Sequence, residues 1–499
     1  MAADGGQLLR LACLNCKQRK KKCDKELPSC GHCVSKSLRC SYQNQTRPKN
    51  AVHTAHIHTA HSVVESTPKR LQRASPAVHE APIASVAFVI PADVASANSS
   101  LYRHVNSIVR STGQFVDDIT VRYFEGIHRF LPVVSRARFN QHLGTPDAAP
   151  PADFSVLLLA ICLITYDPIL SSSSGAVDRH SIFVSARSIL AQLQAVSSPS
   201  LHLIQAGLLL ALYEYAHGQP ERAFASIASC ARIAYSAGIH QCRQQSVDEL
   251  ADDVEEAANT WWGLVICERA MIGELAVFDQ PLVTIFPDET SQLPTEPEIV
   301  DEGDASVESI APVPLSSSFT VDVGGFGRTA QAARLLDQVL DAMKMSDLKG
   351  QLARLDFLSS TIRSFLNAVL QPWHDKPRAY CGAIALAIRT LFILHYHILG
   401  LAPADITNTK YKTPEEWFEN SHATLDFATR MTMAIVNSYQ GISAHLSDTL
   451  PPNYMYMIKA ALGHLQYSSA EDSTGWRLDA ELRLRNSLAP LNRRWAVGA

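Results

Sequence analysis

The chain has 499 residues, of which 46% are hydrophobic, and a formal net charge of −4 at pH 7. Its apolar runs at 156–164 and 201–216 are too short or too interrupted for a membrane span of about twenty apolar residues, so the sequence argues against a membrane protein. The small net charge conceals a polarised chain, because residues 1–50 contain eleven Lys or Arg against three Asp or Glu while the rest has an excess of acidic residues. Such a basic N-terminal segment attracts nucleic acid phosphates.

Six of the eleven cysteines lie near the start of the chain with the spacing C-x2-C-x6-C-x6-C-x2-C-x6-C. Two C-x-x-C pairs, each followed by a third cysteine, suit tetrahedral zinc, and six sulfurs complete two four-coordinate sites only if two are shared. Disulfides are the alternative, but the N-terminus lacks a secretory signal pattern, which predicts an intracellular protein with reduced thiols. The candidate ligands of two zinc ions are Cys13, Cys16, Cys23, Cys30, Cys33 and Cys40.

The cysteine-rich segment has too little apolar surface to fold by itself. About thirty residues with few large apolar side chains cannot offset the conformational entropy lost on ordering the chain. Structural zinc contributes about 10–16 kcal/mol at neutral pH. We therefore expect this segment to be unfolded without metal.

Five of the six residues between Cys16 and Cys23 are cationic. On a helix whose orientation is fixed by zinc, they would face DNA, where Lys and Arg contact phosphates and the guanine O6 and N7 atoms. A solvated charge run and a nuclear import signal are the alternatives. A run held inside a zinc cluster favours DNA contact, and the candidate residues are Lys17, Arg19, Lys20, Lys21 and Lys22.

Residues 11–42 resemble the six-cysteine binuclear zinc cluster of fungal transcription regulators. In that family each half of the cluster begins with a C-x-x-C pair at the start of a short helix, and these helices are expected here at 14–22 and 31–38. The loop that connects the halves carries a proline, which is Pro28 in this sequence. The resemblance implies that Cys13 and Cys30 are shared by both zinc ions. The other ligands then divide between the ions, with Cys16 and Cys23 at one and Cys33 and Cys40 at the other.

The same resemblance assigns roles to the basic residues. Arg19 and Lys20 occupy the positions that reach a CGG triplet in the major groove. Each good pair with a base discriminates by about 1–3 kcal/mol. The other lysines of the segment are expected to contact phosphates, namely Lys17, Lys21, Lys22, Lys25 and Lys36.

Residues 46–100 are rich in Ser, Thr, Ala, Pro and His, which predicts a flexible linker. Four histidines at 53, 56, 58 and 61 are a conceivable metal site, although a polar tract is the favoured interpretation. The linker has no apolar heptad repeat, so the dimerising coiled coil common in the family is not expected here. Binding as a monomer to one triplet and formation of a homodimer through the C-terminal region both stay open.

The region 101–499 is predicted to be helical throughout, which makes the fold class all-α. An apolar pattern begins at Val116 and stops at Pro132, and Thr413-Pro414-Glu415-Glu416 has the form of a capping box with Pro at the first helical position. Nearly four hundred residues exceed one ordinary core, which favours two packed subdomains. Further helices are expected at 154–166, 201–216, 221–237, 255–278, 351–370, 382–399 and 414–438.

Stretches at 123–140, 203–240 and 255–281 resemble the regulatory, or middle homology, domain of the same fungal family. The chain departs from that pattern at Glu268-Arg269, where the family commonly has Asp-Arg, and at 279–281, where it often has Gly-Arg-Pro. Four aromatic residues could line a pocket for a small-molecule effector, although core packing is favoured. They are Tyr213, Tyr215, Trp261 and Trp262.

Acidic residues accumulate among Pro, Ser and Thr near 288–322, and no Lys or Arg lies between Arg269 and Arg328. This composition predicts a disordered acidic loop, which would either bind transcription coactivators or be a plain surface insertion.

The sequence lacks the catalytic motifs G-x-S-x-G, H-E-x-x-H and the P-loop, so an enzyme is not expected. The predicted function is a nuclear, sequence-specific regulator of RNA polymerase II genes that binds double-stranded DNA and serves a metabolic or secondary-metabolite gene cluster. A zinc module that binds only protein is the alternative. The expected organisation is a tail at 1–9, the zinc cluster at 10–45, the linker at 46–100 and the helical regulatory domain at 101–499.

Overall fold

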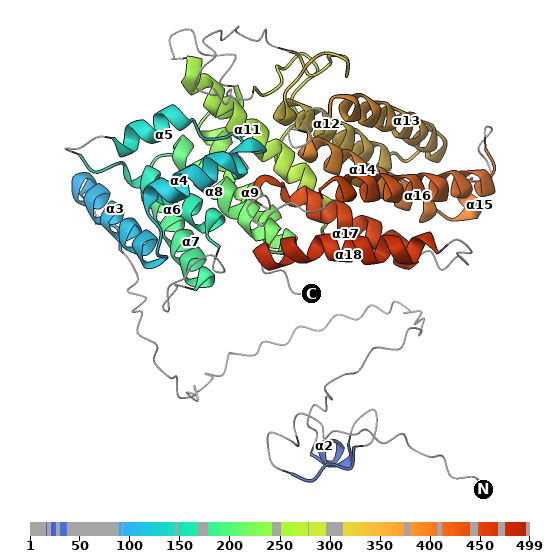
Figure 1. Cartoon of the computed structure of the whole chain (residues 1–499), viewed down its shortest axis with the longest axis horizontal. Coiled ribbons are helices and arrows are strands. Elements are labelled where there is room, and N and C mark those ends of the chain that lie inside the picture. The colour runs from blue at the N-terminus through green and yellow to red at the C-terminus, as the bar shows by residue number, and fades with distance from the viewer. Residues whose placement is uncertain are drawn as a thin grey trace, which may run out of the picture. The chain divides into compact units, whose positions relative to one another are not determined.

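The computed structural model describes residues 16, 21–25, 30–36, 89–91, 93–144, 148–167, 178–241, 251–277, 279–295, 313–373, 380–406, 412–439, 448–467 and 475–495. The chain forms two units, residues 1–84 and 85–499 (Figure 1). The linker expected at 46–100 was too long, because a helix already begins at Val94 and the second unit at residue 85. Residues 46–88, with their four histidines, lie outside the described residues.

The second unit is a body of helices. Its first half contains α3 (Val94–Ser111), α4 (Val116–Glu125), α5 (Arg136–Leu143), α6 (Ala152–Thr165), α7 (Arg179–Val196), α8 (Leu201–Ala216), α9 (Pro220–Ser236) and α11 (Ala251–Ile272), with the short 3-10 helices η1 (Ile127–Arg129) and η2 (Ile239–Gln241). Its second half contains α12 (Gly325–Met343), α13 (Leu348–Trp373), α14 (Cys381–Leu399), α15 (Pro403–Ile406), α16 (Pro414–Ser438), α17 (Pro452–Tyr467) and α18 (Trp476–Trp495). The all-α fold class is confirmed. Within the described ranges, the extended pairing is one isolated bridge between Gln292 and Pro314.

Local sequence signals set the ends of several helices. At the start of α16 the Thr413 hydroxyl accepts from the Glu416 amide at 3.3 Å, and the Thr413 amide donates to the Glu416 carboxylate at 2.7 Å, which confirms the capping box. The prediction for α11 was wrong at its end, because the helix stops at Ile272, before Gly273, a residue of low helix propensity. Similarly, α4 ends at Glu125, before Gly126, and η1 follows it.

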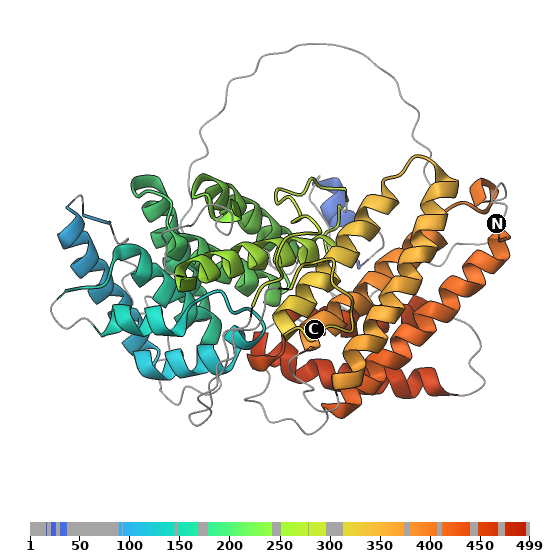
Figure 2. The same ribbon diagram turned by 90° about the horizontal axis from the view of Figure 1, so that it is seen from above.

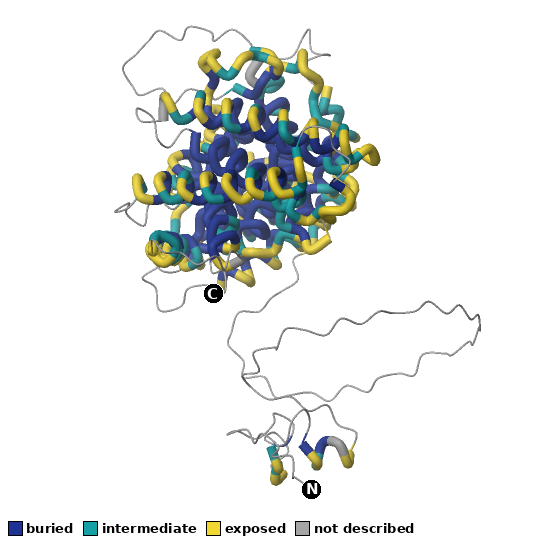
Figure 3. The backbone as a smooth tube through the Cα atoms, turned by 90° about the vertical axis from the view of Figure 1, so that its right-hand side faces the viewer, coloured by how far each residue is buried: buried dark blue, intermediate teal, exposed yellow. Residues whose placement is uncertain are grey.

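The helical body has one continuous core, so the expectation of two subdomains was wrong. Buried apolar residues from α3 to α18 form one cluster. Helix α11 packs against α8 and α9 on one side and α12 on the other, and thereby joins the two halves (Figure 1). Figure 3 shows the buried residues in dark blue concentrated inside the body and the exposed residues in yellow on its outer turns.

One helix, α14, is long and apolar enough to cross a membrane by length and composition alone. It packs against α12, α13, α16 and α17, which appear in yellow to red in Figure 2. Of its apolar stretch, 78% is buried within the body. This burial identifies α14 as a core helix.

The close approach of α8 to α9 depends on Gly207. A Cβ atom at this position would overlap the sulfur of Cys230 on α9. We expect Gly207→Ala to lower the free energy of unfolding by about 1–3 kcal/mol because the helices would have to separate. Gly463 on α17 is the matched control, since a Cβ there would have nothing within 4 Å, and Gly463→Ala should be neutral or stabilising by up to about 1 kcal/mol. Urea unfolding checks both, and equal effects of the two changes would contradict this interpretation of the α8–α9 contact.

Candidate zinc centre and basic surface

The described cysteines of the N-terminal unit converge on one point. The Sγ atoms of Cys16, Cys23 and Cys30 all lie within 4.8 Å of one another, and those of Cys16 and Cys30 are 3.6 Å apart. Thiolates on one tetrahedral zinc, at Zn–S of about 2.3 Å, lie about 3.8 Å apart. The arrangement therefore fits a metal shared by these three cysteines.

Cys33 lies in the same buried cluster as Cys16 and Cys30, and Cys23 packs against it. No disulfide joins these four cysteines to one another. The exposed fractions of Cys16, Cys30 and Cys33 are 1%, 0% and 0%, which is unusual in so small a module unless the sulfurs are packed around a metal. The two remaining candidate ligands, Cys13 and Cys40, lie outside the described residues.

One hydrogen bond and one left-handed residue shape the chain between the cysteines. The Asp24 carboxylate accepts from the Gly31 amide at 2.7 Å and so ties the first half of the cluster to the start of α2 (Gly31–Ser35). A Cβ at Gly31 would lie 2.6 Å from that carboxylate oxygen, so glycine allows the close approach. Lys25 has a φ of 65°, in the left-handed region, where the chain turns between the halves. Sequence reasoning did not identify Asp24 as a positioning residue.

The expected helix at 14–22 was too long. Cys16 is helical, but Lys21 and Lys22 are not, and the Lys21 amide donates to the Cys16 carbonyl at 2.9 Å, a bond across five residues that closes a helix end. The second helix, expected at 31–38, ends at Ser35. The second helix is therefore a single short segment, and the helix that contains Cys16 ends before Lys21.

Among the candidate DNA contacts, Lys21, Lys22 and Lys36 are exposed and Lys25 is half-buried. The three exposed lysines are therefore accessible to phosphates in solution. The candidates Lys17, Arg19 and Lys20 lie outside the described residues.

Cysteines of the helical body belong to a different environment. Burial raises the pKa of the Cys162, Cys230 and Cys267 thiols to about 12. Metal ligands must be thiolates. These three thiols lie in the apolar core of the body, and none belongs to a group of candidate metal ligands among the described residues.

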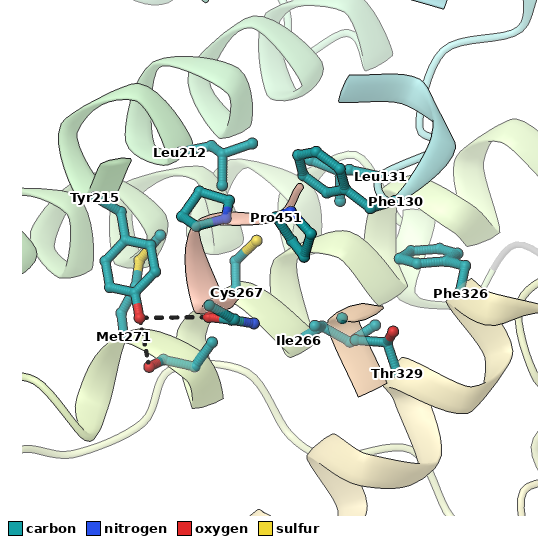
Figure 4. A pocket seen from close by; sticks show the side chains of 14 residues that line it. Phe130, Leu131, Leu212, Tyr215, Ile266, Cys267, Met271, Phe326, Thr329 and Pro451 are labelled. Atoms are coloured by element: carbon teal, nitrogen blue, oxygen red, sulfur yellow. Dashed lines mark hydrogen bonds between the residues drawn. The ribbon is translucent and has the colours of Figure 1, made fainter. Parts of the chain in front are cut away.

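All four aromatic candidates are buried core residues. Tyr213 stacks on Phe183 with ring centroids 5.4 Å apart, Trp261 packs edge-on against Tyr235, and the Trp262 indole donates to the Gln292 carbonyl at 3.1 Å. Tyr215 alone of the four lines a small apolar cavity of about 40 Å³, together with Cys267, Phe326 and Pro451 (Figure 4). A cavity of this size is too small for a ligand of the usual 300–1,000 Å³ class.

The Glu268-Arg269 pair, near the end of α11, is buried. The Arg269 guanidinium donates to Glu268 at 2.8 Å and to Asp337 on α12 at 2.9 Å. The Glu268 carboxylate accepts from the Val283 and Thr284 amides at 2.7 and 3.0 Å. This cluster fixes the segment after the 279–281 turn to α11 and α12, so the pair that departs from the family pattern retains a structural role.

The acidic segment near 288–322 is ordered at both ends, contrary to the expected disorder. The Leu293 amide donates to Val313 and the Leu315 amide to Ser291, both at 2.8 Å, and Glu289 pairs with Arg334 at 2.7 Å. Residues 296–312, which include most of the acidic side chains, lie outside the described residues.

Comparison with known proteins matches both parts of the chain. Residues 11–49 match the fungal Zn(2)-Cys(6) binuclear cluster domain, and residues 121–275 match the fungal specific transcription factor domain. A domain of the first kind binds two zinc ions. The family expected from the sequence and the two-zinc cofactor are thereby confirmed.

Three relatives are similar to parts of the chain. Transcription factor BOA15 of Botryotinia fuckeliana is 27% identical over 125 residues, which make up 25% of this chain and 68% of that protein. Regulator of drug sensitivity 1 of Saccharomyces cerevisiae is 53% identical over 38 residues, 8% of this chain and 5% of that protein. Tropolone cluster transcription factor tropK of Talaromyces stipitatus is 21% identical over 281 residues, 46% of this chain and 49% of that protein. The last two matches leave half or more of those relatives uncovered.

Proposed function

We propose that this chain, a transcription regulator that combines a fungal Zn(2)-Cys(6) binuclear cluster domain with a fungal specific transcription factor domain, binds DNA sequence-specifically at CGG triplets. The observation that carries the proposal is the placement of five cations between two cysteines of the cluster. Metal fixes the orientation of that segment, and fixed cations can read base edges as well as phosphates. Catalysis is no part of the proposed role.

Zinc would be held by the six cysteines, with Cys13 and Cys30 shared between the two ions. The convergence of Cys16, Cys23 and Cys30 supports this assignment. When bound, zinc supplies a rigid centre in place of a hydrophobic core. The Asp24–Gly31 contact of the chain positions the second half of the zinc cluster. The basic segment between Cys16 and Cys23 would contact the DNA.

Two lysine variants distinguish a base contact from a phosphate contact. We expect Lys20→Ala to reduce the affinity for a CGG duplex by about 1–3 kcal/mol and to relax the preference over a scrambled duplex. We expect Lys36→Ala to weaken binding to both duplexes alike and to reduce the slope of log affinity against log salt by about one. Fluorescence anisotropy on both duplexes over a salt series measures each effect. Indistinguishable behaviour of the two variants would contradict the division of roles.

We propose a nuclear location and a pathway-specific role in a metabolic or secondary-metabolite gene cluster. The similarity to a tropolone cluster transcription factor supports the second point. The helical body would serve regulation, through transcription coactivators at the acidic segment, through homodimer formation or through a small-molecule effector. Selection of bound sequences from random duplexes by the full chain tests the whole proposal, and recovery of no enriched motif would contradict it.

A further inference from the structure

A second, larger cavity opens where α11 ends, between α12, α14 and α17. Its volume is about 490 Å³, within the range of small-molecule sites. The lining residues that carry charge or polar groups are Glu274, Arg389, Tyr396, His397, Tyr456 and Lys459. No sequence motif pointed to this cavity, because its residues come from segments far apart in the chain.

The Arg389 guanidinium donates its hydrogen bonds to groups of the protein. Its guanidinium is 3% exposed and donates to the Ala270 carbonyl at 3.2 Å, to the Tyr215 hydroxyl at 3.2 Å and to the Glu274 carboxylate. These contacts close the end of α11 and neutralise the cation. Arg389 and Glu274 therefore form a fixed pair in the cavity wall and leave no net charge there.

Lys459 carries a positive charge that the Arg389–Glu274 pair does not neutralise. Its ammonium lies 4.8 Å from the centroid of the Tyr456 ring, and no carboxylate in the described part of the chain lies within 4.0 Å of it. Burial lowers its pKa, although Glu274 opposes the shift. A half-buried cation without an ion pair gains most from a partner that carries negative charge.

Aromatic rings form much of the remaining wall. Phe392 and Tyr396 on α14 stack with centroids 6.2 Å apart, and Tyr456 on α17 also lines the cavity. Burial lowers the pKa of His397, which disfavours a positive charge on its imidazole. The cavity thus combines apolar aromatic faces with one net positive charge.

We propose that this cavity binds a small aromatic carboxylate, with the carboxylate at Lys459 and the ring against the aromatic wall. For its regulatory consequence this inference rests on the proposed function, but the binding itself is measured without DNA. The ligand would bridge α14 and α17 beside the Arg389–Glu274 pair that closes α11. Occupancy would therefore stabilise the junction between the two halves of the body.

Calorimetric titration of the full zinc-containing chain tests the site with 2-naphthoate and with its neutral counterpart 2-naphthamide. We expect naphthoate to bind more tightly than naphthamide, and Lys459→Gln to weaken naphthoate binding by about tenfold or more while naphthamide binding changes little. Lys349→Gln is the matched control, because Lys349 is an exposed lysine on α13 that does not line the cavity. Ala460→Trp, which fills the cavity, should abolish the binding of both probes.

Circular dichroism of each variant separates loss of the site from loss of the fold. Absence of naphthoate binding to the unchanged chain would overturn the proposal, and so would equal affinity for both probes or an undiminished affinity in Lys459→Gln. Naphthoate binding in a chain that shows no DNA preference would leave the cavity assignment intact and count against the proposed function alone.

Discussion

Replacing Cys30 with alanine is expected to unfold the zinc cluster module and abolish DNA binding. In the proposed arrangement Cys30 is shared by both metal ions, so its loss leaves neither site with four sulfurs. Structural zinc contributes about 10–16 kcal/mol, and folded domains have a free energy of unfolding of only about 5–15 kcal/mol. The buried cluster in the described part of the module consists of cysteines, so this part offers no apolar packing that could compensate.

Elemental analysis and anisotropy with a CGG duplex measure the effect on the full chain. The unchanged protein should carry about two zinc ions, and Cys30→Ala should lose metal and DNA affinity together. Cys267→Ala is the control, since this cysteine lies in the helical body and lines only the small apolar cavity. Full DNA affinity in Cys30→Ala would eliminate the shared-ligand assignment.

Replacing Glu268 with alanine should destabilise the helical body by about 3–5 kcal/mol. The carboxylate is fully buried and accepts from Arg269 and from the Val283 and Thr284 amides. Its removal would leave a buried guanidinium with one carboxylate partner fewer and two backbone donors unsatisfied. Each unsatisfied buried donor costs about 1–3 kcal/mol.

Urea unfolding followed by circular dichroism measures this change. Glu481→Ala is the matched control, because Glu481 forms an exposed pair with Arg485 on α18, and such surface pairs contribute about 0–1 kcal/mol. A similar loss in both variants would show that the buried pair does not hold the segment after α11 in place.

Helix ends were predictable where capping signals and the apolar pattern agree. Helix α8 was predicted at its observed bounds, after the Ser200 N-cap, and α16 likewise, after Thr413. The region of α18 was expected to be helical, but its bounds were not predicted, because the helix contains Pro490, half of its residues are polar, and contacts from distant segments hold it in place. Arg494, for example, donates to the Ile164 carbonyl at 2.8 Å, a contact between residues 330 positions apart.

The zinc centre was predictable from spacing because its ligands lie within thirty residues of one another. The Arg389–Glu274 pair and Lys459 were not, since their meeting depends on how α11, α14 and α17 pack. Likewise, composition predicted disorder near residue 290, whereas the Glu289–Arg334 contact fixes that end of the segment. The local sequence pattern thus identified the metal chemistry, whereas tertiary packing determined the contacts between residues far apart in the sequence.

The central claim is that zinc presents a basic segment to a specific DNA sequence. Anisotropy of the full chain with a CGG duplex and a scrambled duplex, before chelation, after chelation and after zinc is restored, tests it most directly. We predict at least about tenfold tighter binding to the CGG duplex, loss of this preference on chelation and its recovery with zinc. Equal affinity for the two duplexes, or a preference that survives removal of the metal, would contradict the account.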